Sequence, residues 1–336
     1  MAARTARYGP SATYAPPSMP DPGDPGWPPR DRVLGNVLWE LLLVGAVAVA
    51  YVLATRAHPG QFGVADLAPL AMQGAVVGFV AVGLALSIRA AVPNLAVGAI
   101  ASGAGVLLTR LSVQEHWGYP AAIAASVGAA MAAGLALWLV IATLNVPAWA
   151  ASLGASVLIA GALYGIADGS ARLVGRYIPE PWPWFAAFAV ASVLGGVVWL
   201  SPTVQRALSG FRSEEDPAAR PRGSFGALIA LVLSSGLAGL AGVLAALQLG
   251  TASPVAFDSQ WLVALGAVLL GGVSAFGRRA GVFGTVLGIV LLLLVQRWLL
   301  LDQHGAGAFT MVVGAAILVG MVATRFTESA GRRPGY

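Results

Sequence analysis

The chain has 336 residues, of which 58% are hydrophobic and 10% are charged, with a mean hydropathy of +0.80 and a formal net charge of +5. A soluble domain carries about 25% charged residues, so this composition excludes an ordinary soluble protein and predicts a polytopic membrane protein. The sequence has no cysteine, which excludes disulfides, thiolate metal sites and a catalytic cysteine. All 19 basic residues are arginine, which also excludes the lysine-containing P-loop that hydrolyses ATP. We therefore expect no enzyme activity, no cofactor and no metal.

Residues 1–32 differ in composition from the rest of the chain. Eight prolines lie between Pro10 and Pro29, and aliphatic residues are almost absent. This pattern is typical of a disordered tail. The tail lacks the short apolar core and cleavage site of a signal peptide, so we expect the first apolar segment to stay as an uncleaved anchor.

Apolar runs of the length needed to cross a bilayer, ~20 residues, predict about ten transmembrane helices. They cover residues 34–55, 67–88, 94–110, 119–143, 147–167, 183–201, 224–249, 258–276, 281–301 and 306–325. The predicted fold is thus an all-α transmembrane domain over residues 33–326, followed by a short tail, 327–336. With the N-terminus in the cytosol, fourteen of the 19 arginines fall on the cytosolic side and five outside. This positive-inside bias predicts that both termini are cytosolic.

Few polar residues interrupt the predicted spans. Charged residues fall at or near span ends; Glu40 is expected to reach water by snorkelling, and Arg89 follows directly on the second span. The other polar residues within spans are hydroxyls and amides, which we interpret mainly as hydrogen-bonding partners between helices. A path lined by such groups suits a neutral polar solute. The candidate residues of a substrate path are Gln73, Asn94, Ser102 and Ser274.

The stretch from Trp261 to Leu301 is predicted to form a membrane hairpin whose turn carries Arg278 and Arg279. It is rich in glycine, which permits close approach of helix backbones. The glycines expected to pack helices are Gly271, Gly272, Gly281, Gly284 and Gly288.

The longest cytosolic loop, residues 202–223, contains a predicted short helix. Ser213 is a suitable N-cap, and the acidic residues after it favour the positive end of a helix dipole. Such a helix could dock on a cytosolic motor, or the loop could be a solvated connector. The candidate coupling residues are Ser213, Glu214, Glu215, Ala218, Ala219 and Arg220.

Three segments resemble the ribose/xylose-type permeases of bacterial ATP-binding-cassette importers, a superfamily that includes branched-chain amino-acid permeases. The segment 250–295 is similar to the pattern G-x-A-S-P, V-x-L-G-G-x-S-x-x-G-G-x-G and G-T-x-x-G in that order. Residues 92–98, VPNLAVG, resemble the family's G-I-D-L-S-V-G, with Asn94 in place of its aspartate. Residues 214–220 are similar to the E-E-A-A-R of the coupling loop, interrupted by Asp216 and Pro217.

The resemblance implies a multi-pass permease subunit in the bacterial cytoplasmic membrane that carries a monosaccharide or similar small polar solute. It implies cytosolic ATPase subunits, an extracytoplasmic solute-binding protein and a second permease subunit as partners, with membrane lipid around the helices and no nucleic acid. A branched-chain amino-acid or nucleoside permease of the same superfamily is an alternative. So are a secondary carrier or facilitator, which the lack of charges deep in the spans disfavours, and a membrane scaffold that does not transport.

Overall fold

A computed structural model describes residues 33–167, 172–173, 179–201, 203–204, 225–274 and 281–329. The tail 1–32, the predicted coupling helix with its six candidate residues, and Arg278 and Arg279 all lie outside these ranges. The predictions made for them are untested by the fold.

The described ranges contain ten α-helices, nine of which are long and apolar enough to cross a membrane, α3 being counted with the π-helical turn that continues it. This confirms the prediction of a helical, multi-pass membrane protein. The helices are α1 (Val33–Ala57), α2 (Val64–Arg89), α3 (Val97–Thr109) with the π-helical turn η1 (Arg110–Gln114), α4 (Tyr119–Leu144), α5 (Ala148–Ala167), α6 (Pro181–Trp199), α8 (Phe225–Leu249), α9 (Gln260–Leu270), α10 (Gly284–Leu301) and α11 (Ala306–Ser329). Two short strands, β1 (Arg172–Leu173) and β2 (Thr251–Ala252), pair in antiparallel fashion.

The eighth predicted span, residues 258–276, is wrong as a full crossing. Its helix, α9, has only 11 residues and would rise about 16 Å, half of the hydrocarbon thickness. It ends at Leu270 because Gly271 and Gly272 follow, the latter with φ +82°. Glycine adopts this left-handed conformation without strain and commonly stops helices.

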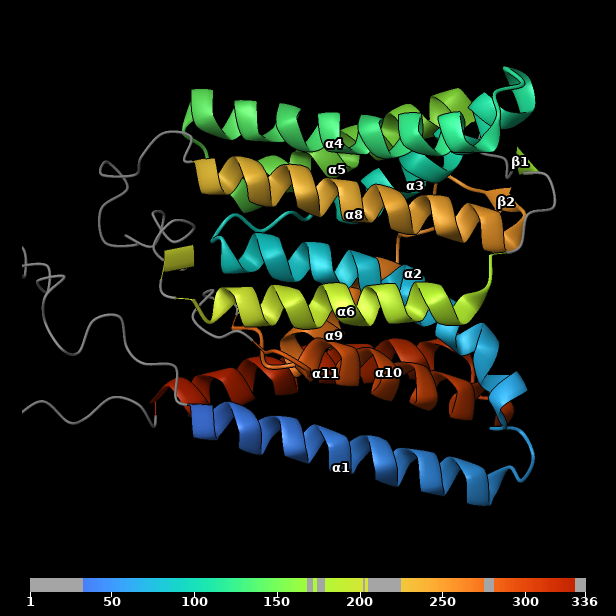
Figure 1. Cartoon of the computed structure of the whole chain (residues 1–336), viewed down its shortest axis with the longest axis vertical. Coiled ribbons are helices and arrows are strands. Elements are labelled where there is room, and N and C mark those ends of the chain that lie inside the picture. Colours follow the sequence, from blue (N-terminus) through green and yellow to red (C-terminus); the bar gives the residue numbers. More distant parts are fainter. Residues whose placement is uncertain are drawn as a thin grey trace, which may run out of the picture. The chain divides into compact units, whose positions relative to one another are not determined.

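The two ends of the bundle are named here after the ends of α1, the Val33 end and the Ala57 end (Figure 1). At the Val33 end, Arg89 at the end of α2 lies beside Gly195 near the end of α6 and bonds to Gly281 just before α10. At the Ala57 end, His58 after α1 bonds to Asp302 after α10. The described chain begins and finishes at the Val33 end (Figure 1).

Two halves of the bundle share one series of elements. In each half a long helix is followed by a non-helical segment, a short helix and two further long helices: α2 to α5 in the first half, and α8 to α11 in the second. Corresponding helices run in opposite directions along the bundle (Figure 1). The packing follows the same relation, since α3 packs on α8, α4 and α5 while α9 packs on α2, α10 and α11. The halves are thus related as an inverted repeat, an arrangement found in many transporters.

The main core lies around α2, which packs on α6, α8, α9 and α10. Leu84, Leu244 and Ile289 are at most 1% exposed, and Val77 and Phe188 are fully buried beside them. By contrast, α1, α4, α5 and α11 carry many exposed aliphatic residues, such as Val157 at 69% and Leu318 at 66%. A helix with one apolar face buried and another exposed suits a membrane, whose interior is itself apolar.

Glycines allow backbone contact where the short helices pack. A Cβ at Gly284 of α10 would overlap the carbonyl oxygen of Gly271, and one at Gly288 would lie 2.6 Å from the oxygen of Ala267 in α9. A Cβ at Gly320 of α11 would likewise overlap the backbone of Leu269. Three of the five glycines proposed from the sequence, Gly271, Gly284 and Gly288, therefore lie in the α9–α10 contact. Gly281 also lies close to Gly271, whereas Gly272 faces the ring of Trp39 in α1.

Candidate functional site

The first interruption of the helical series is the segment 90–96 between α2 and α3. Pro93 disfavours a helical conformation at the residue before it, and Ala91 takes a left-handed φ of 57°. The backbone N–H groups in such a buried break need acceptors. Side chains supply them: Asn94 N donates to Ser87 Oγ at 3.2 Å, Leu95 N to Ser152 Oγ at 3.1 Å, and Ala96 N to Asn94 Oδ1 at 3.1 Å.

Asn94 links this interruption to the other half of the bundle. Its amide Nδ2 donates to Ser234 Oγ at 3.1 Å and to Ser235 Oγ at 3.0 Å, both on α8. All three side chains are fully buried. The two serines stand nine and ten residues into α8, so the amide lies about 14 Å from the Val33 end of that helix. A hydrogen-bonded cluster of neutral groups therefore lies deep in the bundle.

The second interruption, residues 250–259, precedes α9. It contacts α3, the helix that follows the first interruption. Phe257 N donates to Ser102 Oγ in α3 at 3.2 Å. A Cβ at Gly98 would come within 2.9 Å of the Trp261 ring and 3.2 Å of the Phe257 oxygen. The start of α3 is thus packed directly against the start of α9; Ala96 and Val97 at the start of α3 are buried, whereas Asp258 and Ser259 just before α9 are exposed.

The four residues proposed from the sequence for a substrate path lie at separate places. Asn94 lies in the first interruption, whereas Ser102 lies in α3 and bonds to the second interruption. Gln73 Nε2 donates to Gln296 Oε1 at 2.9 Å, nearer the Ala57 end. Ser274 is fully buried in the link after α9. The structure does not bring these four together around one space, so a joint path stays a prediction that would need the helices to move.

The chemistry of the buried polar side chains is nearly all neutral. Within the described ranges the buried polar and charged residues are serines, threonines, one asparagine and Arg89, with no carboxylate among them. Those ranges also hold no group of three or more His, Cys, Asp or Glu that could bind a metal. Hydroxyls and amides can exchange hydrogen bonds with a neutral solute. They cannot supply the carboxylate that commonly couples transport to protons or sodium.

Arg89 and Glu40 both bond to the backbone just before α10. Arg89 is the last residue of α2 and is only 3% exposed, rather than placed in water. Its Nη2 donates to the carbonyl oxygen of Gly281 at 3.3 Å. Glu40 accepts a hydrogen bond from Phe283 N at 3.1 Å. Phe283 lies at the start of α10, where the positive end of the helix dipole stabilises a carboxylate. Trp39 beside it donates to Leu270 O at 2.8 Å.

These contacts gather α1 and α2 around the link between α9 and α10. The sequence alone offered one signal for this arrangement, the glycine pair at Gly195 and Gly196 in α6. A Cβ at Gly196 would lie 2.7 Å from Val282 Cα, so glycine is needed for Val282 to approach α6 this closely. The neighbouring Gly195 lies against the Arg89 guanidinium. Comparison of the chain with family models, with curated proteins and with solved structures gives no match.

Proposed function

We propose that this chain is the membrane-spanning permease subunit of an ATP-binding-cassette importer, carrying a small neutral polar solute such as a monosaccharide across the bacterial cytoplasmic membrane. The observation that carries the proposal is the buried Asn94 amide, which joins an interrupted helix of one half to α8 of the other. In transporters built as inverted repeats, substrates bind near the bilayer midplane between such discontinuous helices.

The neutral lining supports both the solute class and the energy source. The described helices bury no carboxylate, which disfavours coupling to an ion gradient. The sequence has no lysine for a P-loop, so ATP hydrolysis belongs to separate subunits. The resemblance of residues 250–295 to ribose/xylose-type permeases supplies the remaining partners: two ATPases, a solute-binding protein and a second permease subunit.

The test is uptake of radiolabelled solutes by intact cells, with and without the gene for this chain. The panel contains pentoses, hexoses, nucleosides and leucine, so that it separates a sugar permease from its nucleoside and amino-acid alternatives. We expect one neutral solute to be lost with the gene. Its uptake should stop when ATP is depleted and continue when an uncoupler collapses the proton gradient while ATP is maintained.

A matched pair of variants connects uptake to the site. Asn94→Leu removes the bridging amide, whereas Ser126→Ala removes a buried hydroxyl that bonds only within α4, to Ala122 O. Uptake should fall in the first variant and persist in the second, at equal amounts of folded protein. Transport by the purified chain alone in vesicles, without any ATPase, would contradict the proposal and favour a facilitator.

A further inference from the structure

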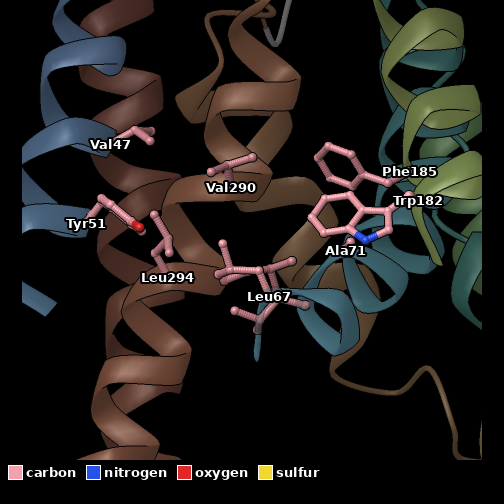
Figure 2. A pocket seen from close by; sticks show the side chains of 10 residues that line it. Val47, Tyr51, Leu67, Ala71, Trp182, Phe185, Val290 and Leu294 are labelled. Carbon is pink, nitrogen blue, oxygen red and sulfur yellow. The ribbon is translucent and has the colours of Figure 1, made fainter. Parts of the chain in front are cut away.

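A cavity of about 250 Å³ lies between α1, α2, α6 and α10, and none of its lining residues belongs to the interruptions 90–96 and 250–259. Figure 2 shows side chains from these four helices converging on one space, with Val47 and Tyr51 on the α1 side and Phe185 and Trp182 on the α6 side. Its lining is almost entirely carbon. An apolar cavity of this size does not hold stable water, so its natural occupant is apolar.

The depth of the cavity matches one leaflet of a bilayer. Trp182 is the second residue of α6, at the Ala57 end, and an aromatic belt places tryptophan at that level of the membrane. On α1 the lining reaches inward to Val47, ten residues before Ala57, which is about 15 Å along the helix. Half of the hydrocarbon core is also about 15 Å thick. The cavity thus begins near the interface and finishes near the midplane.

The cavity opens to the lipid-facing side of the bundle. Helix α1 packs on α10 and α6 packs on α2, so α1 and α6 form two separate walls. Tyr51 and Trp182, one on each wall, are 40% and 44% exposed. Molecules reaching this opening from the membrane are lipids, whose acyl chains have the required length and chemistry.

Two charged residues lie at the Ala57 end of helices that line the cavity, one basic and one acidic, and they suit a phospholipid headgroup with both signs of charge. Arg297 lies on the same face of α10 as the lining residues Val290 and Leu293, about one turn nearer the Ala57 end. Its Nε atom is buried without a hydrogen-bonding partner among the described residues. Glu180 is exposed just before α6. A phosphate can accept from the guanidinium, and an ammonium group can approach the carboxylate.

We propose that this cavity binds one acyl chain of a zwitterionic phospholipid from the leaflet at the Ala57 end, with the phosphate held by Arg297. The lipid fills the space beneath α1 and completes the packing between α1 and α6. Because no lining residue belongs to either interruption, this proposal does not rest on the solute that the chain carries.

The experiment uses the full chain in vesicles of phosphatidylethanolamine and phosphatidylglycerol. A trace of phosphatidylethanolamine carries a diazirine near the middle of one acyl chain, and labelled peptides are mapped after irradiation. We expect labelling concentrated at Val47 and Leu293, above that at Val157 of α5, a side chain that is 69% exposed. Labelling no higher at the cavity than at Val157 would overturn the proposal.

Two pairs of variants sharpen the test. Ala71→Phe fills the cavity from α2 and should remove its labelling, whereas Val157→Phe adds the same bulk on an exposed face and should not. If Ala71→Phe fails to fold, Val47→Phe fills the space from α1 and serves instead. Labelling that survives a folded cavity-filling variant would refute the site.

The headgroup contact is tested with Arg297→Met and with a diazirine-bearing diacylglycerol, which lacks the phosphate. The native chain should prefer the phospholipid probe over the diacylglycerol by about fivefold, as expected for one basic side chain at the membrane surface. The variant should lose that preference. Equal labelling of the native chain by the two probes would refute the phosphate contact. Because the chain has no cysteine, a single Val47→Cys substitution also reports the alternative occupant: crosslinked dimers at that position would mean that a second copy fills the cavity.

Discussion

Replacing Asn94 by alanine tests whether the first interruption is held in place by its own side chain. The native amide makes two hydrogen bonds to α8 and accepts one from Ala96 N. Hydrogen bonds between membrane helices average ~0.6 kcal/mol each, so the loss of two removes ~1.2 kcal/mol. The Ala96 N–H is left without this acceptor in a buried site, which costs a further ~1–3 kcal/mol. The expected loss of stability is therefore about 2–4 kcal/mol.

The assay is equilibrium unfolding of the purified chain in mixed micelles, followed by tryptophan fluorescence, with Ser126→Ala as the control. Ser126 is equally buried, but its hydroxyl donates only to Ala122 O in its own helix. Its removal should change the free energy of unfolding by less than ~0.5 kcal/mol. If Asn94→Ala is as stable as the control, the conformation of segment 90–96 is set by backbone and packing alone, and the reasoning about this cluster fails.

Three further predictions follow from other parts of the bundle. Gly284→Ala should reduce the yield of folded protein, because its Cβ would overlap the Gly271 oxygen at a typical cost of ~1–3 kcal/mol; Gly154→Ala, with nothing within 4 Å, should leave the yield unchanged. Arg89→Met should speed hydrogen exchange of the amides next to Gly281 by about tenfold, measured by mass spectrometry, since a hydrogen bond from a charged donor contributes ~1.5–3 kcal/mol; unchanged exchange would show that the link holds itself. Peptide tags inserted at Gly9 and at Gly335 should both remain intact when protease is added to whole cells. Cleavage of either tag would overturn the cytosolic placement of the termini.

Hydropathy and length predicted ten crossings, and nine of them correspond to helices of the described ranges that are long and apolar enough to cross a membrane, because a long apolar run is stable in hydrocarbon only as a helix. Segment 258–276 misled because hydropathy counts Leu270, Gly271 and Gly272 alike as apolar. The end of α9 depends instead on backbone conformation, through the positive φ of Gly272. Residues 253–259 were likewise partly included in a span, although they form turns before α9 begins.

The site was predictable in kind but not in arrangement. Asn94 was proposed as an amide within a predicted span, at the position where the resembled family has an aspartate, and the structure buries it at an interruption between helices. Its partners, Ser234 and Ser235, lie 140 and 141 residues away in the sequence, and helical periodicity does not identify which helix faces which. Arg89 was expected at the end of the second span, because charge is costly in hydrocarbon. It is the last residue of α2 but is buried, and the carbonyl of Gly281 accepts a hydrogen bond from it. The glycines of α6 hint at a close contact there, but they do not identify Arg89 or Gly281 as the groups involved.

The two inverted halves differ in the interactions at the ends of their first long helices, α2 and α8. The last residue of α2 is the buried Arg89, whereas the last residue of α8 is Leu249, which is 64% exposed. Separating the helices at the Val33 end would pull a guanidinium away from its carbonyl acceptor in an apolar setting, which costs several kcal/mol. At the Ala57 end, β2, which follows α8, pairs with β1. Arg172 lies opposite Ala252, and Leu173 lies opposite Thr251. The two corresponding helix ends are thus held by different interactions: a buried guanidinium bonded to a carbonyl at the Val33 end, and backbone pairing of two short strands at the Ala57 end.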